Sequence, residues 1–337
     1  MATYLVTGGA GFIGSHIVER LLSEDHRVLA LDNLSTGSRK NLEAVSGHPK
    51  FEFVEASVCN QAVTTELVTA ADAVFHLAAS VGVELVMNEP LDSLRNNVCG
   101  TDTILRAAEI RKTKVILTST SEVYGTSKEI PYRESGSSSL GSPDRIRWGY
   151  AAGKLLDEFA ALSAWHQHAL PVVIVRLFNT IGPRQIGTYG MVVPRLIGQA
   201  LDGRPLTIYG TGEQTRSFVY VSDIVEWYLR LANLDSAVGE VFNLGNPNEI
   251  SINRLAERIL KITGPSAGIR YVPYESVHPA GFEDTQRRVP CIDKVVQTTG
   301  HAPAVPLDSA LGRIHTWLRG KRRAAGKEIS LPTAAAG

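Results

Sequence analysis

Two side chains that together can take a proton from an alcohol lie four residues apart in this sequence. Tyr150 and Lys154 fall in a stretch rich in Ala and Leu, where this spacing places both on one face of a helix. A neighbouring positive charge favours the phenolate, so we expect the lysine to lower the pKa of the tyrosine. The pair therefore predicts a general base that acts on a hydroxyl group.

A run of hydroxyl side chains precedes this pair. Lys114–Leu117 has the apolar pattern of a buried parallel strand, and the Thr and Ser side chains at 118–121 follow it directly. Ligands of open α/β sheets bind at the carboxyl ends of the strands, so we expect these hydroxyl groups at the site. Glu122 comes next and adds a carboxylate there.

A glycine-rich turn near the start predicts a dinucleotide site. The short strand Tyr4–Thr7 leads into Gly8, Gly11 and Gly14, and an amphipathic helix follows to about Leu22. Glycines at these positions allow a tight turn, close approach of the backbone to a pyrophosphate, and close packing of the helix on the strand.

The acid expected to bind the adenosine ribose is Asp32. It ends the predicted strand Arg27–Asp32 and lies 18 residues after Gly14, close to the spacing of about 20 that is typical of this role. A carboxylate repels a 2′-phosphate, so the pattern favours NAD over NADP.

The rest of the chain predicts an α/β fold with a doubly wound parallel sheet. Apolar strands alternate with helical segments, among them a strand over 73–79, a helix from 96 to about 110 and a last helix over about 307–319. We expect a dinucleotide-binding domain over residues 1–178 with returns at about 211–245, a smaller substrate-binding lobe over 179–210 and 246–320, and a disordered tail over 321–337.

Composition restricts the class of protein. The 337 residues include 34 basic and 34 acidic side chains, so bulk charge gives no reason to expect a nucleic-acid or membrane surface. No apolar run approaches the roughly 20 residues that cross a bilayer, and the first residues lack a basic signal region. Cys59, Cys99 and Cys291 are far apart and lack metal-ligand spacing. We expect free thiols, no metal and a cytoplasmic protein.

The order and spacing of five motifs resemble the extended short-chain dehydrogenase/reductase family, in particular its nucleotide-sugar epimerases, dehydratases and decarboxylases. The motifs are Thr-Gly-Gly-Ala-Gly-Phe-Ile-Gly at 7–14, His-Leu-Ala-Ala at 76–79, Ser-Glu-Val-Tyr-Gly at 121–125, Tyr150 with Lys154, and Arg-Ser-Phe-Val-Tyr-Val-Ser-Asp at 216–223. The resemblance implies a Rossmann domain whose bound NAD takes a hydride from C4 of a sugar and later returns it. Tyr150 would be the base, Lys154 would hold the nicotinamide ribose, and Thr120 would orient the C4 oxygen.

The same resemblance implies sets of binding residues and an assembly. For the cofactor they are Gly8, Gly11, Phe12, Ile13, Gly14, Asp32, Asn33, Ser35, Gly37, Ser57, Val58, Leu77, Ala78, Ala79, Asn97, Thr118, Tyr150 and Lys154. For the substrate, a UDP-sugar or another nucleotide-diphosphate sugar, they are Asn179, Arg184, Val192, Tyr209, Arg216 and Arg288. A homodimer through the helices that follow Asn97 and Tyr150 is implied as well.

Glu122 indicates chemistry at C5 after the oxidation at C4. A ketone at C4 makes a C5 carboxylate a β-keto acid, which can lose carbon dioxide, whereas 4-epimerisation requires no acid at position 122. Ser121-Glu122 and the segment Arg147-Trp148-Gly149-Tyr150 are similar to UDP-glucuronate decarboxylases and UDP-apiose/xylose synthases, and Arg288 in the segment 281–290 resembles an arginine that reaches their active site. We therefore expect a UDP-glucuronate decarboxylase in which Ser121, Glu122 and Arg288 are also catalytic.

Three alternatives remain open. A 4-epimerase acting on UDP-glucose, UDP-glucuronate or their N-acetyl analogues would leave the mass of the substrate unchanged, and a 4,6-dehydratase would remove water from it. A non-catalytic NAD-binding regulator on the same fold would be expected to lack Tyr150 or Lys154, and both are present.

Overall fold

A parallel sheet with its strands in the order β11-β6-β5-β4-β1-β2-β3 lies at the centre of the protein. The computed structural model describes residues 1–187, 191–264, 268–276, 286–324 and 326. The strands are β1 (Thr3–Thr7), β2 (Arg27–Asp32), β3 (Phe51–Glu55), β4 (Ala73–His76), β5 (Lys114–Thr120), β6 (Val172–Leu177) and β11 (Val241–Leu244). The strand order reverses between β1 and β4, where sheets of this kind bind ligands at their carboxyl edge. The predicted doubly wound α/β fold is confirmed.

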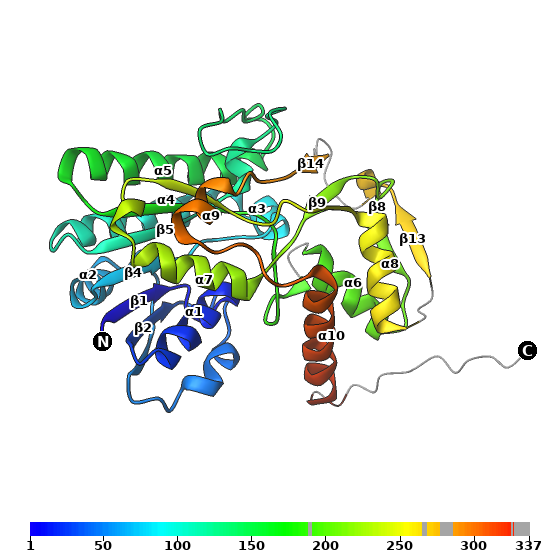
Figure 1. The fold of residues 1–337 in the computed structure, drawn as a ribbon, viewed down its shortest axis with the longest axis horizontal. Coiled ribbons are helices and arrows are strands. Elements are labelled where there is room, and N and C mark those ends of the chain that lie inside the picture. The colour runs from blue at the N-terminus through cyan, green and yellow to red at the C-terminus, as the bar shows by residue number, and fades with distance from the viewer. Residues whose placement is uncertain (188–190, 265–267, 277–285, 325, 327–337) are drawn as a thin grey trace, which may run out of the picture.

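Helices cover both faces of this sheet (Figure 1). α2 (Gln61–Ala70), α4 (Pro90–Glu109) and α5 (Trp148–His168) pack on one face, and α1 (Phe12–Ser23) and α7 (Val221–Ala232) pack on the other. Successive side chains of a strand point to opposite faces, so a strand covered on both sides must be apolar at nearly every position. This explains the unbroken apolar runs in the sequence.

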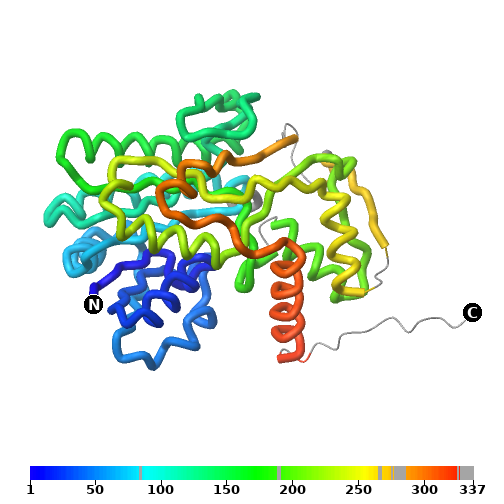
Figure 2. Tube along the Cα trace, viewed as in Figure 1, coloured from blue at the N-terminus to red at the C-terminus, as the bar shows by residue number. Residues whose placement is uncertain are grey.

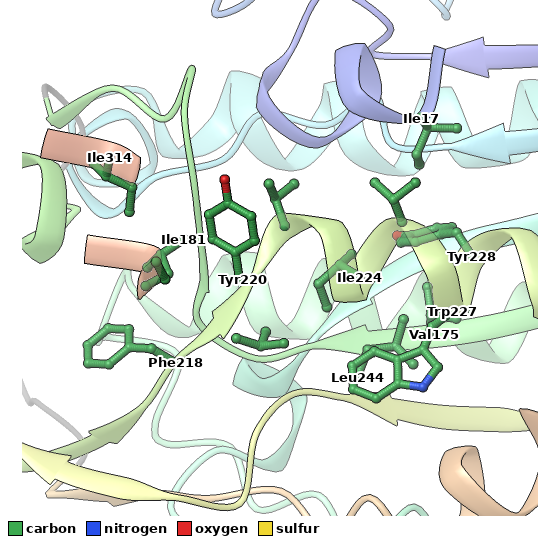
Figure 3. Packing of buried hydrophobic residues seen from close by; sticks show 14 of the residues in the cluster. Ile17, Val175, Ile181, Phe218, Tyr220, Ile224, Trp227, Tyr228, Leu244 and Ile314 are labelled. Carbon is green, nitrogen blue, oxygen red and sulfur yellow. The ribbon is translucent and has the colours of Figure 1, made fainter. Parts of the chain in front are cut away.

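The core beneath α7 reaches the edge of the sheet where the hydroxyl run lies. Figure 3 shows Trp227 and Tyr228 of α7 beside Val175 of β6 and Leu244 of β11. Trp227 and Tyr228 are fully buried. The hydroxyl group of Tyr228 is 2.6 Å from Oγ1 of Thr118, so this packing also orients the first hydroxyl of the run.

Smaller elements lie outside the central sheet, and Figure 2 shows that two separate stretches of chain supply them. The strands are β7 (Thr180–Ile181) paired with β10 (Val219–Tyr220), β8 (Leu206–Tyr209) paired with β13 (Ile269–Val272), and the sheet of β12 (Glu249–Ser251), β9 (Thr215–Ser217) and β14 (Arg287–Arg288). The helices are α6 (Val192–Leu201), α8 (Ile252–Thr263) and α10 (Leu307–Ala324), which pack against one another, and α9 (Asp293–Thr299), which packs on α7 and β11.

Two helices are longer than predicted. α4 begins at Pro90 and not at Asn96, because a proline suits the first helical position, where a backbone N–H has no partner within the helix. α10 continues to Ala324, so residues 321–324 of the expected tail are helical. Residues 325 and 327–337 of that tail, and residues 281–285 of the Arg288 segment, lie outside the described residues.

The fourth strand is shorter than predicted. β4 ends at His76, because the N–H groups of Leu77 and Ala78 donate to Oγ1 of Thr7 at 3.2 and 3.1 Å. The chain therefore leaves the sheet beside the glycine turn. Within the described ranges, no helix is both long enough and apolar enough to cross a membrane.

Candidate active site

A cavity of about 780 Å³ opens at the carboxyl edge of the sheet, and we call it the glycine-turn cavity. The glycine turn forms its floor, and close approach of backbone explains the residue type. A Cβ atom on Gly14 would clash with the carbonyl oxygen of Gly8. Gly8 itself has φ 68°, and a Cβ atom there would lie 2.9 Å from the backbone nitrogen of Ala78. The space and the amino terminus of α1 suit a pyrophosphate.

Asp32 lies at the end of β2, where the ribose-binding acid is expected. Its Oδ2 accepts the N–H of Ala10 at 3.0 Å and its Oδ1 accepts that of Leu34 at 2.7 Å. Burial raises the pKa of the Asp32 carboxyl, and these two hydrogen bonds oppose the rise. The residues present therefore fit an adenosine ribose at this position.

Most of the predicted cofactor residues line the glycine-turn cavity. They are Gly8, Gly11, Phe12, Ile13, Gly14, Asp32, Asn33, Ser35, Ser57, Val58, Leu77, Ala78, Ala79, Asn97, Thr118 and Tyr150. Gly37 and Lys154 are not among the lining residues. Gly37 packs under the carboxylate of Asp32, where a Cβ atom would come within 2.9 Å of both oxygens. Lys154 is buried behind the wall, with Nζ 3.1 Å from the carbonyl oxygen of Thr118.

Tyr150 lies where the glycine-turn cavity meets a second one. It lies in the first turn of α5 and hydrogen-bonds to the side chain of Thr120 at the end of β5. Burial raises the pKa of Tyr150 above its usual value, the charge of Glu122 raises it further, and the bond to Thr120 opposes the rise.

The expected lowering of this pKa by Lys154 is wrong for the structure as it stands. Nζ of Lys154 is 3.2 Å from Oδ2 of Asp157, one turn further along α5, and both side chains are buried. The carboxylate balances the ammonium charge, so little of that charge acts on the phenol. Asp157 had no role in the predicted site.

The second cavity, of about 440 Å³, contains the charged cluster of the site, and we call it the Glu122 cavity. Oε1 of Glu122 is 2.7 Å from Nη1 of Arg288, and its Oε2 accepts from Nη2 of Arg147 at 3.1 Å. Burial alone would raise the pKa of Glu122, but the two guanidinium groups outweigh burial and the pKa is lowered. The carboxylate is therefore ionised and held between two cations.

The Glu122 cavity brings together residues that are distant in the sequence. Thr120, Ser121, Glu122 and Tyr150 line it together with five of the predicted substrate residues, which are Asn179, Val192, Tyr209, Arg216 and Arg288. The sixth, Arg184, is placed differently. It lines the glycine-turn cavity, because its backbone turns at φ 72° and Glu19 of α1 holds its guanidinium group.

Other lining residues had no predicted role. Arg147 and Arg195 line the Glu122 cavity, and Trp317 and Lys321 of α10 line the glycine-turn cavity. The motif around Trp148 contains Arg147, so the similarity to decarboxylases was a usable signal for this residue. No local pattern marks the two α10 residues, because their role depends on how α10 docks.

Comparison with known proteins identifies the family of the chain. Residues 4–245 match the model of the NAD dependent epimerase/dehydratase family. The UDP-N-acetyl-alpha-D-glucosaminuronate decarboxylase of Bacillus cytotoxicus is 41% identical over 317 residues, which is 94% of this chain and 97% of that protein. The UDP-glucuronic acid decarboxylase 6 of Arabidopsis thaliana is 38% identical over 91% of this chain and 86% of that protein.

Solved structures show the same likeness. The UDP-glucuronic acid 4-epimerase of Bacillus cereus, in complex with UDP-glucuronic acid and NAD, has a TM-score of 0.85 and 28% identity and covers 95% of this chain and 99% of that one. A UDP-N-acetylglucosamine 4-epimerase from Methanobrevibacter ruminantium has a TM-score of 0.86 and 30% identity, with the same coverage. The chain therefore belongs to the NAD dependent epimerase/dehydratase family, a group of NAD-dependent enzymes that act on nucleotide sugars.

Proposed function

We propose that the protein is a UDP-glucuronate decarboxylase that keeps NAD bound and works through a 4-keto sugar. One observation carries the proposal: Glu122, Arg147 and Arg288 form a charged cluster in the cavity that borders Tyr150. Arginine recognises the carboxylate of a sugar acid, which a uronate 4-epimerase also binds, so the discriminating residue is Glu122, which epimerisation at C4 does not require. The names of the two decarboxylase relatives support the same reaction.

Tyr150, Thr120 and Lys154 would serve the oxidation at C4. Tyr150 takes the proton of the C4 hydroxyl group and Thr120, bonded to the phenol, holds the C4 oxygen in line. When bound, NAD⁺ would supply the hydride acceptor. The resemblance assigns Lys154 to the nicotinamide ribose, and in the structure its Nζ bonds the carbonyl oxygen of Thr118 behind the wall of the glycine-turn cavity.

The charged cluster would serve the chemistry at C5. Once C4 is a ketone, the bond between C5 and the carboxyl carbon breaks, carbon dioxide leaves, and the electron pair moves into an enolate on the C4 oxygen. Arg288 binds the substrate carboxylate or diphosphate, and ionised Glu122 with Ser121 orients a solvent water that gives its proton to C5. Return of the hydride to C4, with a proton to the C4 oxygen from Tyr150, then completes a product lighter by carbon dioxide alone. Arg147 keeps Glu122 ionised and in place.

The two cavities would divide the binding. The residues predicted for NAD, including Asp32 and the glycine turn, hold the dinucleotide, and Asn179, Val192, Tyr209, Arg216 and Arg288 hold the UDP-sugar. The segments 179–210 and 246–320 then form the substrate lobe. Arg184 belongs with the dinucleotide residues because of its position in the glycine-turn cavity.

Incubation with UDP-glucuronate and mass analysis of the nucleotide sugars tests this function. We expect a product lighter by carbon dioxide. An unchanged mass with a galacto configuration in the proton spectrum would identify a 4-epimerase, and loss of water would identify a 4,6-dehydratase. A parallel incubation with UDP-N-acetylglucosaminuronate decides which of the two uronates is preferred.

We also propose a homodimer through α4 and α5. Leu91 and Leu94 of α4 and Leu156 and Phe159 of α5 expose large apolar side chains, and Phe159 is 63% exposed. A soluble chain rarely exposes such a stripe without a partner. Sedimentation velocity should give a dimer for the native protein and a monomer for Phe159→Glu. The three free cysteines support a reducing, cytoplasmic location.

A further inference from the structure

A buried amide behind the charged cluster has no part in the roles proposed so far. Asn243 of β11 is fully buried and is not among the residues that line either cavity. Its Oδ1 accepts the hydroxyl group of Tyr124 at 2.7 Å, and its Nδ2 donates to the carbonyl oxygens of Tyr132 at 2.9 Å and Cys291 at 3.3 Å. The amide thus uses its acceptor and both of its donors.

Two of these partners lie close in the chain to Glu122 and Arg288, the two residues of the ion pair. Tyr124 is the last residue of the short 3-10 helix Ser121–Tyr124, which carries Glu122. Cys291 follows Arg288 by three residues. Arg288 itself lies in strand β14, which pairs with β9. One side chain of the sheet therefore contacts the segment of Glu122 and the segment of Arg288 at once.

The third partner connects these two segments to each other. Tyr132 donates its N–H to the carbonyl oxygen of Val289 at 2.8 Å, and its own carbonyl accepts the N–H of Cys291 at 2.8 Å. Its ring stacks on that of Tyr124 with centroids 4.7 Å apart. The loop between Gly125 and Trp148 is thereby attached both to the segment that carries Glu122 and to the segment that carries Arg288.

The surroundings of Asn243 are held by further polar contacts. Its backbone N–H donates to Oε1 of Glu134 at 2.9 Å. Its neighbour across the sheet, Arg176, makes a buried ion pair with Glu158 at 2.7 Å and lies over the ring of Tyr124 at 4.8 Å. Buried polar groups that are all satisfied hold one arrangement, and removing one of them leaves the others unpaired.

We propose that Asn243 is a positioning residue for the chemistry at C5. By binding the segment of Tyr124 and the segment of Cys291 together, its amide fixes the separation of Glu122 and Arg288. The catalytic part of this inference rests on the proposed function. Asn243 touches no substrate, and Tyr150 and Thr120, which act at C4, lie on α5 and β5 outside its hydrogen bonds.

A single-turnover experiment separates the two steps. Formation of the reduced cofactor, followed by its ultraviolet absorbance, reports oxidation at C4, and the mass of the product reports loss of carbon dioxide. For Asn243→Leu we expect decarboxylation to slow by roughly 10- to 100-fold more than oxidation, the cost of misplacing reacting groups. Tyr124→Phe, which removes one of the three bonds and keeps the stacked ring, should lie between.

Val68→Ala is the matched control for loss of stability. Val68 is fully buried on α2, on the opposite face of the sheet from α7 and away from both cavities. It should lower the unfolding midpoint without separating the two rates. If Asn243→Leu slows both steps equally, or neither, the amide is structural only and the proposal is wrong.

A second measurement needs no substrate. The coupling between Glu122 and Arg288 is obtained from a double-mutant cycle of Glu122→Gln and Arg288→Met in urea unfolding, once in the native protein and once with Asn243→Leu. We expect the coupling to fall by at least half in the second cycle, and an unchanged coupling would overturn the proposal. If the native enzyme releases no carbon dioxide, the proposed function fails and this cycle alone decides the role of Asn243.

Discussion

The two cavities that meet at Tyr150 are built in different ways. The glycine turn of the glycine-turn cavity is built from backbone, and close contacts such as Gly14 with Gly8 and Gly37 with Asp32 join residues near one another in the chain. The Glu122 cavity depends on charged side chains from separate segments, such as Glu122 and Arg288, which meet only in the folded protein. The first arrangement suits a ligand common to a whole family, and the second can change with the reaction.

The largest expected effect comes from a substitution in the glycine turn of the glycine-turn cavity. In Gly14→Ala the new methyl group would clash with the carbonyl of Gly8, so the turn must open and α1 must shift. We expect purified protein without NAD and without turnover, measured from the dinucleotide released on denaturation.

Gly312→Ala is the matched control, because a Cβ atom at this helical glycine of α10 meets no atom within 4 Å. It should keep its NAD and gain roughly 0.5–1 kcal/mol in free energy of unfolding, since alanine favours a helix over glycine. A normal NAD content in Gly14→Ala would contradict the close-approach argument.

Tyr150→Phe tests the side chain that lines both cavities. Loss of the proton acceptor should lower kcat by about 10²–10⁴-fold, while the NAD content stays normal because the glycine turn is untouched. Tyr271→Phe makes the same chemical change at a side chain that is 55% exposed and should leave kcat unaltered. Undiminished turnover in Tyr150→Phe would overturn the assignment of Tyr150 as the base in every enzymatic interpretation of the site.

Arg288→Met tests the charged cluster of the Glu122 cavity alone. It leaves Glu122 with one cation in place of two, so release of carbon dioxide should fall roughly 100-fold with NAD retained. Arg287→Met is the control, because the adjacent arginine pairs with Glu249 and its side chain is 55% exposed. Similar losses in both variants would show that the effect is general and not local to Glu122.

The smallest expected effect is a difference in how His16 on α1 and Glu122 make the stability of the fold depend on pH. Burial, and then the charge of Arg184, lowers the pKa of His16 on α1 from 6.5 to about 4. Since the unfolded chain binds this proton more readily, the stability from neutral His16 is present above pH 6.5 and is lost as the pH falls from 6.5 towards 4. Glu122, whose pKa is lowered, loses its contribution only at more acidic pH.

The unfolding midpoint between pH 7 and pH 5 measures this difference. The native midpoint should fall with pH, and His16→Gln should flatten the fall in part. His76, whose pKa burial lowers to about 3, and His315, whose pKa burial also lowers, contribute to the rest of the fall. Glu122→Gln should leave the slope in this range unchanged. Equal slopes in the native protein and His16→Gln would contradict the assignment.

The parts of the molecule that could be predicted are those encoded by neighbouring residues. Strand periodicity, the glycine turn and the four-residue spacing of Tyr150 and Lys154 are local, and the sheet and the position of Tyr150 follow from them. The charge balance of Lys154 had a local signal as well, because Asp157 follows it by three residues on the predicted helix. The burial of both side chains, which strengthens this pair, is a property of the packed helix.

Contacts between residues far apart in the chain could be predicted only from the resemblance to a known family. No periodicity relates Glu122 to Arg288, and the similarity to decarboxylases alone suggested that both act at one site. Asn243 lies in an ordinary apolar strand pattern, where a buried amide carries no signal of its purpose. Its three partners become visible only when the loop and the Arg288 segment are folded against β11.

The docking of α10 has a practical consequence. Its last turn is anchored to α6, with Nη2 of Arg322 2.8 Å from Oδ1 of Asp202 and 2.9 Å from the carbonyl oxygen of Gly198, while Trp317 and Lys321 face the glycine-turn cavity. A truncation within the last turns of this helix would remove part of the cavity wall together with the anchor on α6. Shortened preparations should therefore keep residues up to Ala324 before any cofactor stoichiometry is interpreted.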